Sequence, residues 1–319
     1  MDGVPHPPAQ AFLGEPRHSG ADVAERSGLD LETARRIRRA LGMPDAADDE
    51  VLYDDDDVEA MAALRSILDL GFPLHDVLTV TRAYGTALAR VADAETRLFR
   101  ERVLEPMVAD GATPDEVTER VRPVVDVLLR HLGRLLDQGH RRHLMVALDA
   151  LGQRGGSESE RAAAGFVDLV DFSRISGDLP GDELGAMVDS FEELAVEVCS
   201  NTGVRLVKVI GDAAMFVSPE GRRALEAART IVRLVEQNSV LPQARSGVDL
   251  GEVVAVGGDY FGRPVNTAAR ITAFAYPGTV VVSRELLDDV GGDGVTTSRI
   301  GTERLKGVGR VELFKVKDA

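Results

Sequence analysis

The feature that most constrains the fold of this chain is a change of hydrophobic period at its middle. Before residue 151, apolar residues recur three or four positions apart, as at Leu64 and Leu68, which is the period of amphipathic helices. After residue 161, short apolar runs alternate with helical stretches. Residues 152–160 have the sequence GQRGGSESE, which lacks any period and is typical of a linker. The chain is therefore predicted to form two domains.

We expect a helical domain over residues 1–151, loosely ordered over residues 1–20, and a second domain over residues 161–319. The second domain has the order strand, helix, strand, strand, helix, strand, followed by a C-terminal extension. This order predicts an α+β fold of the ferredoxin-like type, in which helices cover one face of a mainly antiparallel sheet. The predicted strands are 162–169, 204–210, 213–218, a pair around 244–256, 279–283 and 311–316, and the predicted helices are 182–200, 222–236 and 265–274.

Charge limits the ligands that such a chain can bind. Lys and Arg number 37 against 53 Asp and Glu, a net charge of −16, so most of the surface repels polyphosphates and no nucleic-acid partner is expected. A small anionic substrate is still compatible if a few cations and a metal gather locally. The single cysteine, Cys199, forms no internal disulfide. No signal peptide or apolar span of about 18 residues is visible, so a cytoplasmic protein without a transmembrane segment is expected.

Two carboxylates stand at the ends of predicted strands. Asp168 closes an apolar run, and Asp212 follows Gly211 at a turn between two strands. In a strand–helix–strand–strand unit the first and second of these strands are expected to lie side by side in the sheet, so both carboxylates can approach one point. Two carboxylates suit Mg²⁺ or Mn²⁺, which take their other ligands from water and phosphate. Either aspartate alone is more simply explained as a turn former.

A third segment, residues 258–270, has the sequence GDYFGRPVNTAAR and resembles a motif of a known protein family. Together with residues 166–173 (FVDLVDFS), residues 208–212 (KVIGD) and residues 305–307 (LKG), it resembles the catalytic domain of class III nucleotidyl cyclases. The resemblance covers about residues 162–319. Four motifs in the correct order are specific, whereas each one alone is weak.

The resemblance implies roles for the two aspartates and for a second pair. Asp168 and Asp212 match the residues that hold two divalent metal ions, Mg²⁺ or Mn²⁺, which activate the ribose hydroxyl group and bind the triphosphate. Lys208 and Asp259 match the pair that recognises adenine: lysine donates to ring N1 and aspartate accepts from the amino group. Guanine presents the opposite pattern at these positions. The implied substrate is therefore ATP, and the implied activity is that of an adenylyl cyclase.

The resemblance also assigns residues to the triphosphate. Asn266 and Arg270 are four residues apart, share a helix face, and match the residues that orient the ribose and stabilise charge on the α-phosphate. Arg245 and Lys306 match cations that contact the β- and γ-phosphates. Backbone N–H groups at the start of the following helix are expected to bind phosphate as well; they belong to Leu169, Val170, Asp171 and Phe172.

The first motif departs from the family pattern at two positions. Asp171 stands where the family has Gly, and Ser173 stands where it has Thr. A carboxylate at residue 171 either repels the triphosphate or adds a metal ligand. In the family the metal aspartates and the Asn–Arg pair of one site come from different catalytic domains. A chain with one such domain is therefore expected to form a head-to-tail homodimer with two equivalent sites.

All six histidines lie before the linker, and this half more loosely resembles the helical regulatory domain of pH-responsive actinobacterial cyclases. Histidine is the side chain that ordinarily titrates near neutral pH. His131, His140 and His143, on the helix that leads into the linker, are the candidate regulatory residues.

An alternative function rests on residues 19–75, which resemble the DNA-binding head of MerR-type regulators. Residues 33–39 (TARRIRR) form a predicted basic second helix of a helix-turn-helix, with four arginines that could contact phosphates. In this alternative the second domain senses a nucleotide. The net charge and the downstream motifs favour the cyclase.

Overall fold

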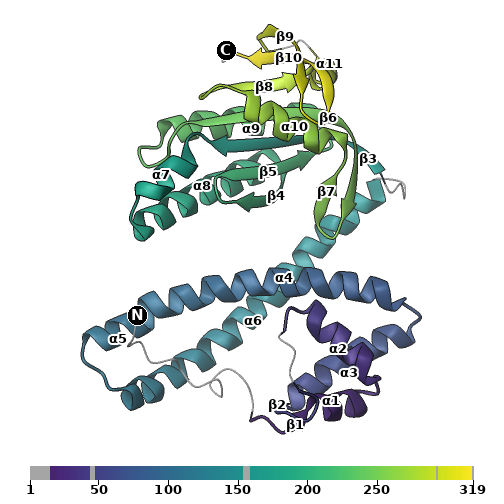
Figure 1. Cartoon of the computed structure of the whole chain (residues 1–319), viewed down its shortest axis with the longest axis vertical. Helices are drawn as coiled ribbons and strands as arrows, with labels where there is room; N and C mark the ends of the chain where they lie inside the picture. The colour runs from purple at the N-terminus through teal and green to yellow at the C-terminus, as the bar shows by residue number, and fades with distance from the viewer. Residues whose placement is uncertain (1–14, 44–46, 154–158, 292–293, 318–319) are drawn as a thin grey trace. The chain divides into compact units, whose positions relative to one another are not determined.

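The computed structural model describes residues 15–43, 47–153, 159–291 and 294–317 (Figure 1). Its contacts divide the chain into two compact units, residues 1–151 and 152–319. The predicted linker 152–160 differs at its described ends, because Gly152 and Gln153 end a helix whereas Ser159 and Glu160 begin a strand. Residues 154–158, like residues 1–14, lie outside the described residues.

The first unit is mainly helical. Its helices are α1 (Gly20–Ser27), α2 (Leu31–Ala40), α3 (Asp55–Asp69), α4 (Leu74–Phe99), the π-helix η2 (Arg100–Leu104), α5 (Glu105–Ala109) and α6 (Pro114–Gln153). The expectation of an all-helical unit is wrong in one detail, because β1 (His18–Ser19) pairs antiparallel with β2 (Val51–Tyr53). Residues 18–20 therefore belong to regular elements, which corrects the expectation that residues 1–20 are loosely ordered.

Local signals in the sequence set the start of this unit. The Ser19 hydroxyl accepts a hydrogen bond from the Asp22 N–H at 3.1 Å, while the Asp22 carboxylate accepts from the Ser19 N–H at 2.8 Å. This reciprocal cap starts α1. Gly28, with φ of 74°, ends α1 in the left-handed conformation that glycine adopts at little cost. The buried faces of α1 and α2 then pack on α3 and the start of α4 around Ile37.

The second unit is built on a mixed sheet. Its strands are β3 (Ser159–Leu169), β4 (Arg205–Ile210), β5 (Ala213–Ser218), β6 (Ala244–Val256), β7 (Asp259–Phe261), β8 (Val280–Ser283), β9 (Thr297–Leu305) and β10 (Gly309–Val316). They are ordered β4-β5-β3-β6-β8-β10-β9, and β7 pairs with β6. The first four positions of this order are those of a ferredoxin-like sheet, so the predicted α+β fold is confirmed.

Three details of the predicted sheet are wrong. β3 lies between β5 and β6, so β3 and β4 are not neighbours. Residues 244–256 form one continuous strand instead of a pair. β7 and β9 are absent from the sequence prediction, because β7 has only three residues and β9 is a largely exposed strand without an apolar run.

Helices cover both faces of the sheet instead of one. One face packs on α8 (Gly181–Thr202) and α9 (Gly221–Gln237). The shorter helices α7 (Phe172–Asp178) and α11 (Arg284–Val290) pack on the same face. The other face packs on α10 (Arg263–Phe274), which lies across β6 and β3 (Figure 1). α10 contains both Asn266 and Arg270, as predicted. Among the residues described, none of the helices in either unit combines the length and apolar character needed to span a bilayer.

Candidate active site

Asp168 and Asp212 meet at one end of the sheet, although the strands that carry them are not neighbours. Asp168 on β3 stands directly opposite Ala213, the first residue of β5, and Asp212 occupies the preceding two-residue turn. Gly211 has φ of 59° and allows this turn. The Asp212 carbonyl accepts a hydrogen bond from the Leu169 N–H at 2.9 Å, which ties the turn to the end of β3. The two carboxylates are therefore close together, as predicted. The strand beside β3 at this point is β5, and Asp212 lies in the turn that leads into it.

Both carboxylates are half-buried, and the electrostatics of the pair favour a cation. Burial raises the pKa of Asp212, the negative charge of Asp168 raises it further, and the Arg245 guanidinium partly offsets these effects. A divalent cation would remove this like-charge repulsion and supply the missing positive charge. Among the described residues no group of three or more His, Cys, Asp or Glu side chains is arranged around a metal position. A two-carboxylate donor set fits Mg²⁺ or Mn²⁺ that takes its remaining ligands from water and phosphate.

Arg245 lies on β6 directly opposite Asp168 and makes an ion pair with it. Its Nε and Nη2 atoms are 3.0 and 2.8 Å from Asp168 Oδ2, and its Nη1 donates to the Ala273 carbonyl oxygen at 3.2 Å. The guanidinium is thus held between the carboxylate pair and the C-terminal end of α10.

The backbone after β3 offers fewer phosphate donors than predicted. The Leu169 N–H bonds to Asp212, and the Val170 N–H donates to the Gln243 carbonyl oxygen at 2.7 Å. Both N–H groups are already hydrogen-bonded at this end of the sheet. Of the four predicted phosphate donors, Asp171 and Phe172 therefore remain as candidates. Asp171 has φ of 59°. The left-handed conformation at residue 171 gives a physical reason for the glycine that the family has there.

Lys208 and Asp259, which are 51 residues apart in the sequence, are in direct contact. The Lys208 Nζ donates to Asp259 Oδ2, and the Tyr260 N–H donates to Asp259 Oδ1 at 2.8 Å. Burial raises the pKa of Asp259, but the hydrogen bonds from Lys208 and from the Tyr260 N–H outweigh it, so the pKa lies below its usual value. The pair therefore presents an ammonium donor beside an ionised carboxylate acceptor. Among the described residues no hydrogen bond or ion pair joins this pair to Asp168 or Asp212.

The other predicted substrate residues are exposed. Asn266 and Arg270 lie one turn apart on α10, and within the described part of the chain neither side chain has a hydrogen-bond or ion-pair partner. Lys306 lies in the turn between β9 and β10, beside a shallow hollow lined by Arg304, Leu305, Lys306, Gly307, Val308 and Gly309. These three side chains are free to contact a ligand.

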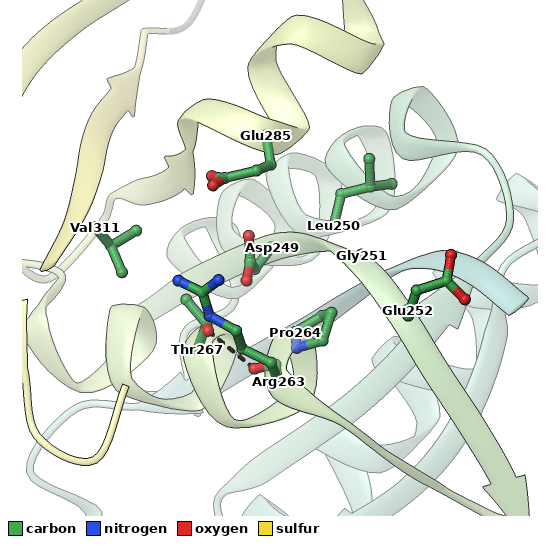
Figure 2. A pocket seen from close by; sticks show the side chains of 9 residues that line it. All are labelled: Asp249, Leu250, Gly251, Glu252, Arg263, Pro264, Thr267, Glu285 and Val311. Atoms are coloured by element: carbon green, nitrogen blue, oxygen red, sulfur yellow. Dashed lines mark hydrogen bonds between the residues drawn. The ribbon is translucent and has the colours of Figure 1, made fainter. Parts of the chain in front are cut away.

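A small cavity of about 220 Å³ lies elsewhere, against the first turns of α10 (Figure 2). None of the residues that line it is a predicted site residue. Its floor includes Asp249, a buried carboxyl group that the sequence analysis missed. The available signal was an aspartate between Val248 and Leu250, within the otherwise uncharged run GVDLG.

The three candidate regulatory histidines do not form a cluster. All are exposed on α6, and His131 and His140 are nine residues apart, which places them on opposite sides of the helix. His140 Nε2 lies 3.2 Å from the Tyr84 hydroxyl on α4. Among the histidines that the structure describes in this unit, the buried one is His18, whose Nε2 lies 2.7 Å from Asp55 Oδ1.

The basic helix of the DNA-binding alternative is α2, and at least two of its four arginines are engaged within the chain. Arg35 Nε donates to Asp48 at 3.0 Å, and Arg38 is buried with its guanidinium 5.0 Å from the centre of the Tyr53 ring. Only Arg36 and Arg39 have exposed side chains. This helix lacks the continuous basic face that the alternative requires.

Comparison with known proteins assigns a family to each of the two units. Residues 8–148 match the model of the adenylate cyclase regulatory domain, and residues 157–318 match that of the adenylate and guanylate cyclase catalytic domain. The chain belongs to this cyclase family. It is 32% identical over 314 residues to a pH-sensitive adenylate cyclase of Mycobacterium tuberculosis, covering 94% of this chain and 78% of the relative.

Two further similarities fall within the same family. An adenylate cyclase of Streptomyces coelicolor is 31% identical over 281 residues, covering 86% of this chain and 72% of the relative. The crystal structure of the catalytic core of a rhodopsin-guanylyl cyclase with converted specificity, in complex with ATPαS, is 24% identical. It covers 50% of this chain and 97% of that one, with a TM-score of 0.47.

Proposed function

We propose that this protein is an adenylyl cyclase that converts ATP to 3′,5′-cyclic AMP and pyrophosphate. The observation that carries the proposal is the convergence of Asp168 and Asp212 at the end of β3 and the β4–β5 turn. In the reaction the ribose 3′-oxygen bonds to the α-phosphorus, the bond from that phosphorus to the bridging oxygen breaks, and pyrophosphate leaves. The 3′-hydroxyl proton passes to solvent. The relatives named adenylate cyclase support this activity.

The base is selected by Lys208 and Asp259. Their contact presents one donor and one acceptor side by side, which matches adenine N1 and the adenine amino group. Guanine would place its O6 acceptor and N1–H donor against groups of the wrong kind, and an unpaired buried polar group is costly. We therefore assign ATP as the substrate.

Activation of the ribose and binding of the triphosphate are assigned to metal ions and to protein groups. Divalent ions held by Asp168 and Asp212 supply, when bound, positive charge that favours ionisation of the 3′-hydroxyl group and neutralises the triphosphate. Asn266 orients the ribose, and Arg270 stabilises the charge that develops on the α-phosphate. Arg245 and Lys306 bind the outer phosphates. The backbone N–H groups of Asp171 and Phe172 add phosphate donors.

Each site is shared between two chains in a head-to-tail homodimer. The carboxylate pair and the Lys208–Asp259 pair form two separate clusters in one chain, and the side chains of Asn266 and Arg270 have no partner among the described residues. Both observations support a site in which one chain supplies Asp168 and Asp212 while its partner supplies Asn266 and Arg270. A closed two-fold dimer then has two equivalent sites.

The helical unit regulates the catalytic unit. The relative named as a pH-sensitive adenylate cyclase supports pH as the signal. We assign His131, His140 and His143 as candidate regulatory residues, with His140 in contact with Tyr84.

The direct experiment incubates the purified chain with Mn²⁺ and either ATP or GTP. We expect 3′,5′-cyclic AMP and pyrophosphate in equal amounts from ATP, little product from GTP, and no product from Asp212→Ala. Wild-type turnover by Asp212→Ala, or hydrolysis of ATP without a cyclic product, would contradict the proposal.

A further inference from the structure

Asp249 is a buried carboxyl group in the catalytic unit for which the proposed chemistry has no use. It lies on β6, is 6% exposed, and forms part of the floor of the cavity beside α10 (Figure 2). Residues alternate between the faces of a strand, so Asp249 shares the face covered by α10 with Gly247 and Gly251. On this face of β6, the Asp249 side chain is therefore flanked by a glycine on each side.

The two glycines allow α10 to lie directly on β6. A Cβ atom at Gly247 would stand 2.4 Å from the Thr272 amide nitrogen, and one at Gly251 would stand 2.9 Å from Pro264 Cγ. Both distances are far below van der Waals contact, so the helix and strand meet without side chains between them at these points. Polar contacts then add to this packing: Arg245 donates to the Ala273 carbonyl oxygen near the C-terminal end of α10, the Thr272 hydroxyl donates to the Phe166 carbonyl oxygen, and Asp249 lies beside the first turns.

The polar group of Asp249 lies among three elements. The Asp249 carboxyl group lines the cavity beside Thr267, and the nearby hydroxyl groups of Ser283 and Thr267 lower its pKa. Thr267 lies on α10, and its hydroxyl also donates to the Arg263 carbonyl oxygen at 2.9 Å. Ser283 is the cap of α11, where its Oγ accepts from the Leu286 N–H at 3.3 Å. Asp249 therefore lies where the first turns of α10 approach the junction of β8 and α11.

The surroundings of Asp249 raise its pKa above the usual value of an aspartate. Burial raises its pKa, the hydrogen bonds from Ser283 and from the Leu250 N–H oppose this, and the charge of Glu285 raises it further. Arg263 and Glu252 also line the cavity, and Figure 2 shows the carboxyl group directed between Glu285 and Thr267. A protonated Asp249 can donate to the Thr267 oxygen while that hydroxyl donates to the Arg263 carbonyl oxygen, whereas an ionised Asp249 can accept from Thr267 only when the hydroxyl turns away from Arg263.

We infer that Asp249 is a positioning residue that fixes α10 on the sheet and thereby holds Asn266 and Arg270 in the geometry that cyclisation needs. The inference rests on the proposed function. Asn266 precedes Thr267 directly, and Arg270 follows it by three residues, so a displacement of this part of α10 moves both. Misplacement of a reacting group by about 1 Å costs roughly 100-fold in rate.

The test compares Asp249→Ala and Asp249→Asn with wild type in the full chain, by steady-state formation of cyclic AMP from Mn²⁺ and ATP. We expect kcat of the alanine variant to fall roughly 10- to 100-fold while KM for ATP changes less than about threefold, because Lys208 and Asp259 lie outside α10. Asparagine can accept from Ser283 and donate to Thr267, so Asp249→Asn keeps kcat within about threefold of wild type.

Two control variants separate positioning from stability. Val248→Ala removes buried atoms on the opposite face of the same strand, and lowers the melting temperature without lowering kcat. Glu285→Gln removes a neighbouring charge from the cavity and leaves kcat unchanged. Thr267→Val keeps the shape of threonine and lowers kcat in the same way as Asp249→Ala. The double variant of Asp249 and Thr267 is no slower than the worse single variant, because both act through one connection.

The outcomes distinguish this inference from the proposed function. A wild-type chain that makes no cyclic AMP overturns the proposed function. An active wild type with unchanged kcat in Asp249→Ala and Thr267→Val overturns the inference alone. Hydrogen exchange of residues 263–274 gives a readout that does not need activity or the alanine variant: exchange is faster in Thr267→Val than in Val248→Ala. Equal exchange in these two variants also overturns the inference.

Discussion

The Arg245 guanidinium lies 2.8 Å from Oδ2 of Asp168, and both side chains are less than 30% exposed. The residue assigned to the outer phosphates therefore neutralises the residue assigned to the metal. In the proposed site, a metal ion and Arg245 would compete for one carboxylate, and nucleotide phosphates would provide an alternative partner for the arginine. The proposal therefore links metal binding to nucleotide binding.

Arg245→Gln removes this competing cation. We expect Mn²⁺ to bind the nucleotide-free variant roughly fivefold more tightly, equivalent to about 1 kcal/mol for a partly buried ion pair, whereas affinity for ATP falls. Isothermal titration of the nucleotide-free protein with Mn²⁺ measures the effect. Arg161→Gln on the same sheet, which removes an ion pair with Asp289, is the matched control and leaves Mn²⁺ affinity unchanged. Weaker binding in Arg245→Gln would show that the arginine supports the metal site.

Asp212→Asn is expected to stabilise the metal-free protein while it abolishes activity. Burial and the charge of Asp168 raise the folded-state pKa of Asp212 above 3.8, so ionisation at neutral pH costs the folded state free energy. The wild type loses this stability as pH rises from about 3.8 through the raised pKa. The stability advantage of asparagine is therefore present at pH 7 and vanishes at low pH. Urea unfolding with EDTA across this pH range measures it, and an advantage that grows toward acid would contradict the assignment.

Asp171→Gly should stabilise the catalytic unit by about 1 kcal/mol, because glycine adopts a positive φ without steric strain. The change also removes the exposed ion pair between Asp171 and Arg174 at 3.8 Å, which contributes little to stability. Urea unfolding measures the difference. The matched control is Ser176→Gly within α7, which is expected to destabilise because its backbone is helical. Equal destabilisation by both changes would argue against strain at residue 171.

The sequence motifs predicted the residues of the candidate site better than the hydrophobic periodicity predicted the strands of the sheet and their order. Asp168 with Asp212 and Lys208 with Asp259 are predicted pairs because the motifs carry the chemistry, and each pair is in place. The neighbours of β3 are mispredicted because chain order does not give sheet order. Residues 244–256 are divided in the prediction because glycines interrupt the apolar pattern, whereas in the structure Gly247 and Gly251 serve contact with α10.

Other features depend on tertiary contacts that no pattern contains. The phosphate role of Leu169 and Val170 is mispredicted because their N–H groups pair with Asp212 and Gln243, which are far away in the sequence. Burial of His18 and Asp249 escapes prediction for the same reason, since a polar residue gives no periodic signal when its partners come from other elements.

Base selection by Lys208 and Asp259 is tested by the paired change Lys208→Glu with Asp259→Cys. This variant reverses the donor and acceptor, so kcat/KM for ATP should fall by roughly 10⁴-fold relative to wild type. Parallel assays with ATP and GTP measure the preference. Lys315→Glu on β10, outside the site, is the charge-matched control and should leave the preference unchanged. An unaltered preference for ATP in the paired variant would remove the adenine-recognition roles.

Regulation through the α6 histidines is tested by replacing His131, His140 and His143 together with Gln. If their protonation shifts the helical unit, the profile of cyclic AMP formation between about pH 5.5 and 7.5 changes shape. His75→Gln, an exposed histidine beside Asp76, is the control and should retain the wild-type profile. Profiles that superimpose after scaling would exclude these three residues as the sensor.

The measurement that tests the central claim most directly is complementation between two inactive variants. In a shared-site homodimer, Asp212→Ala lacks a metal ligand and Arg270→Ala lacks the residue that stabilises the α-phosphate, so each alone is inactive. After subunit exchange, the mixed dimer has one site with both changes and one site with neither. Random exchange predicts that cyclic AMP formation recovers to about one quarter of the wild-type rate. No recovery, with mixed dimers demonstrated by two affinity tags, would contradict a site shared between two chains.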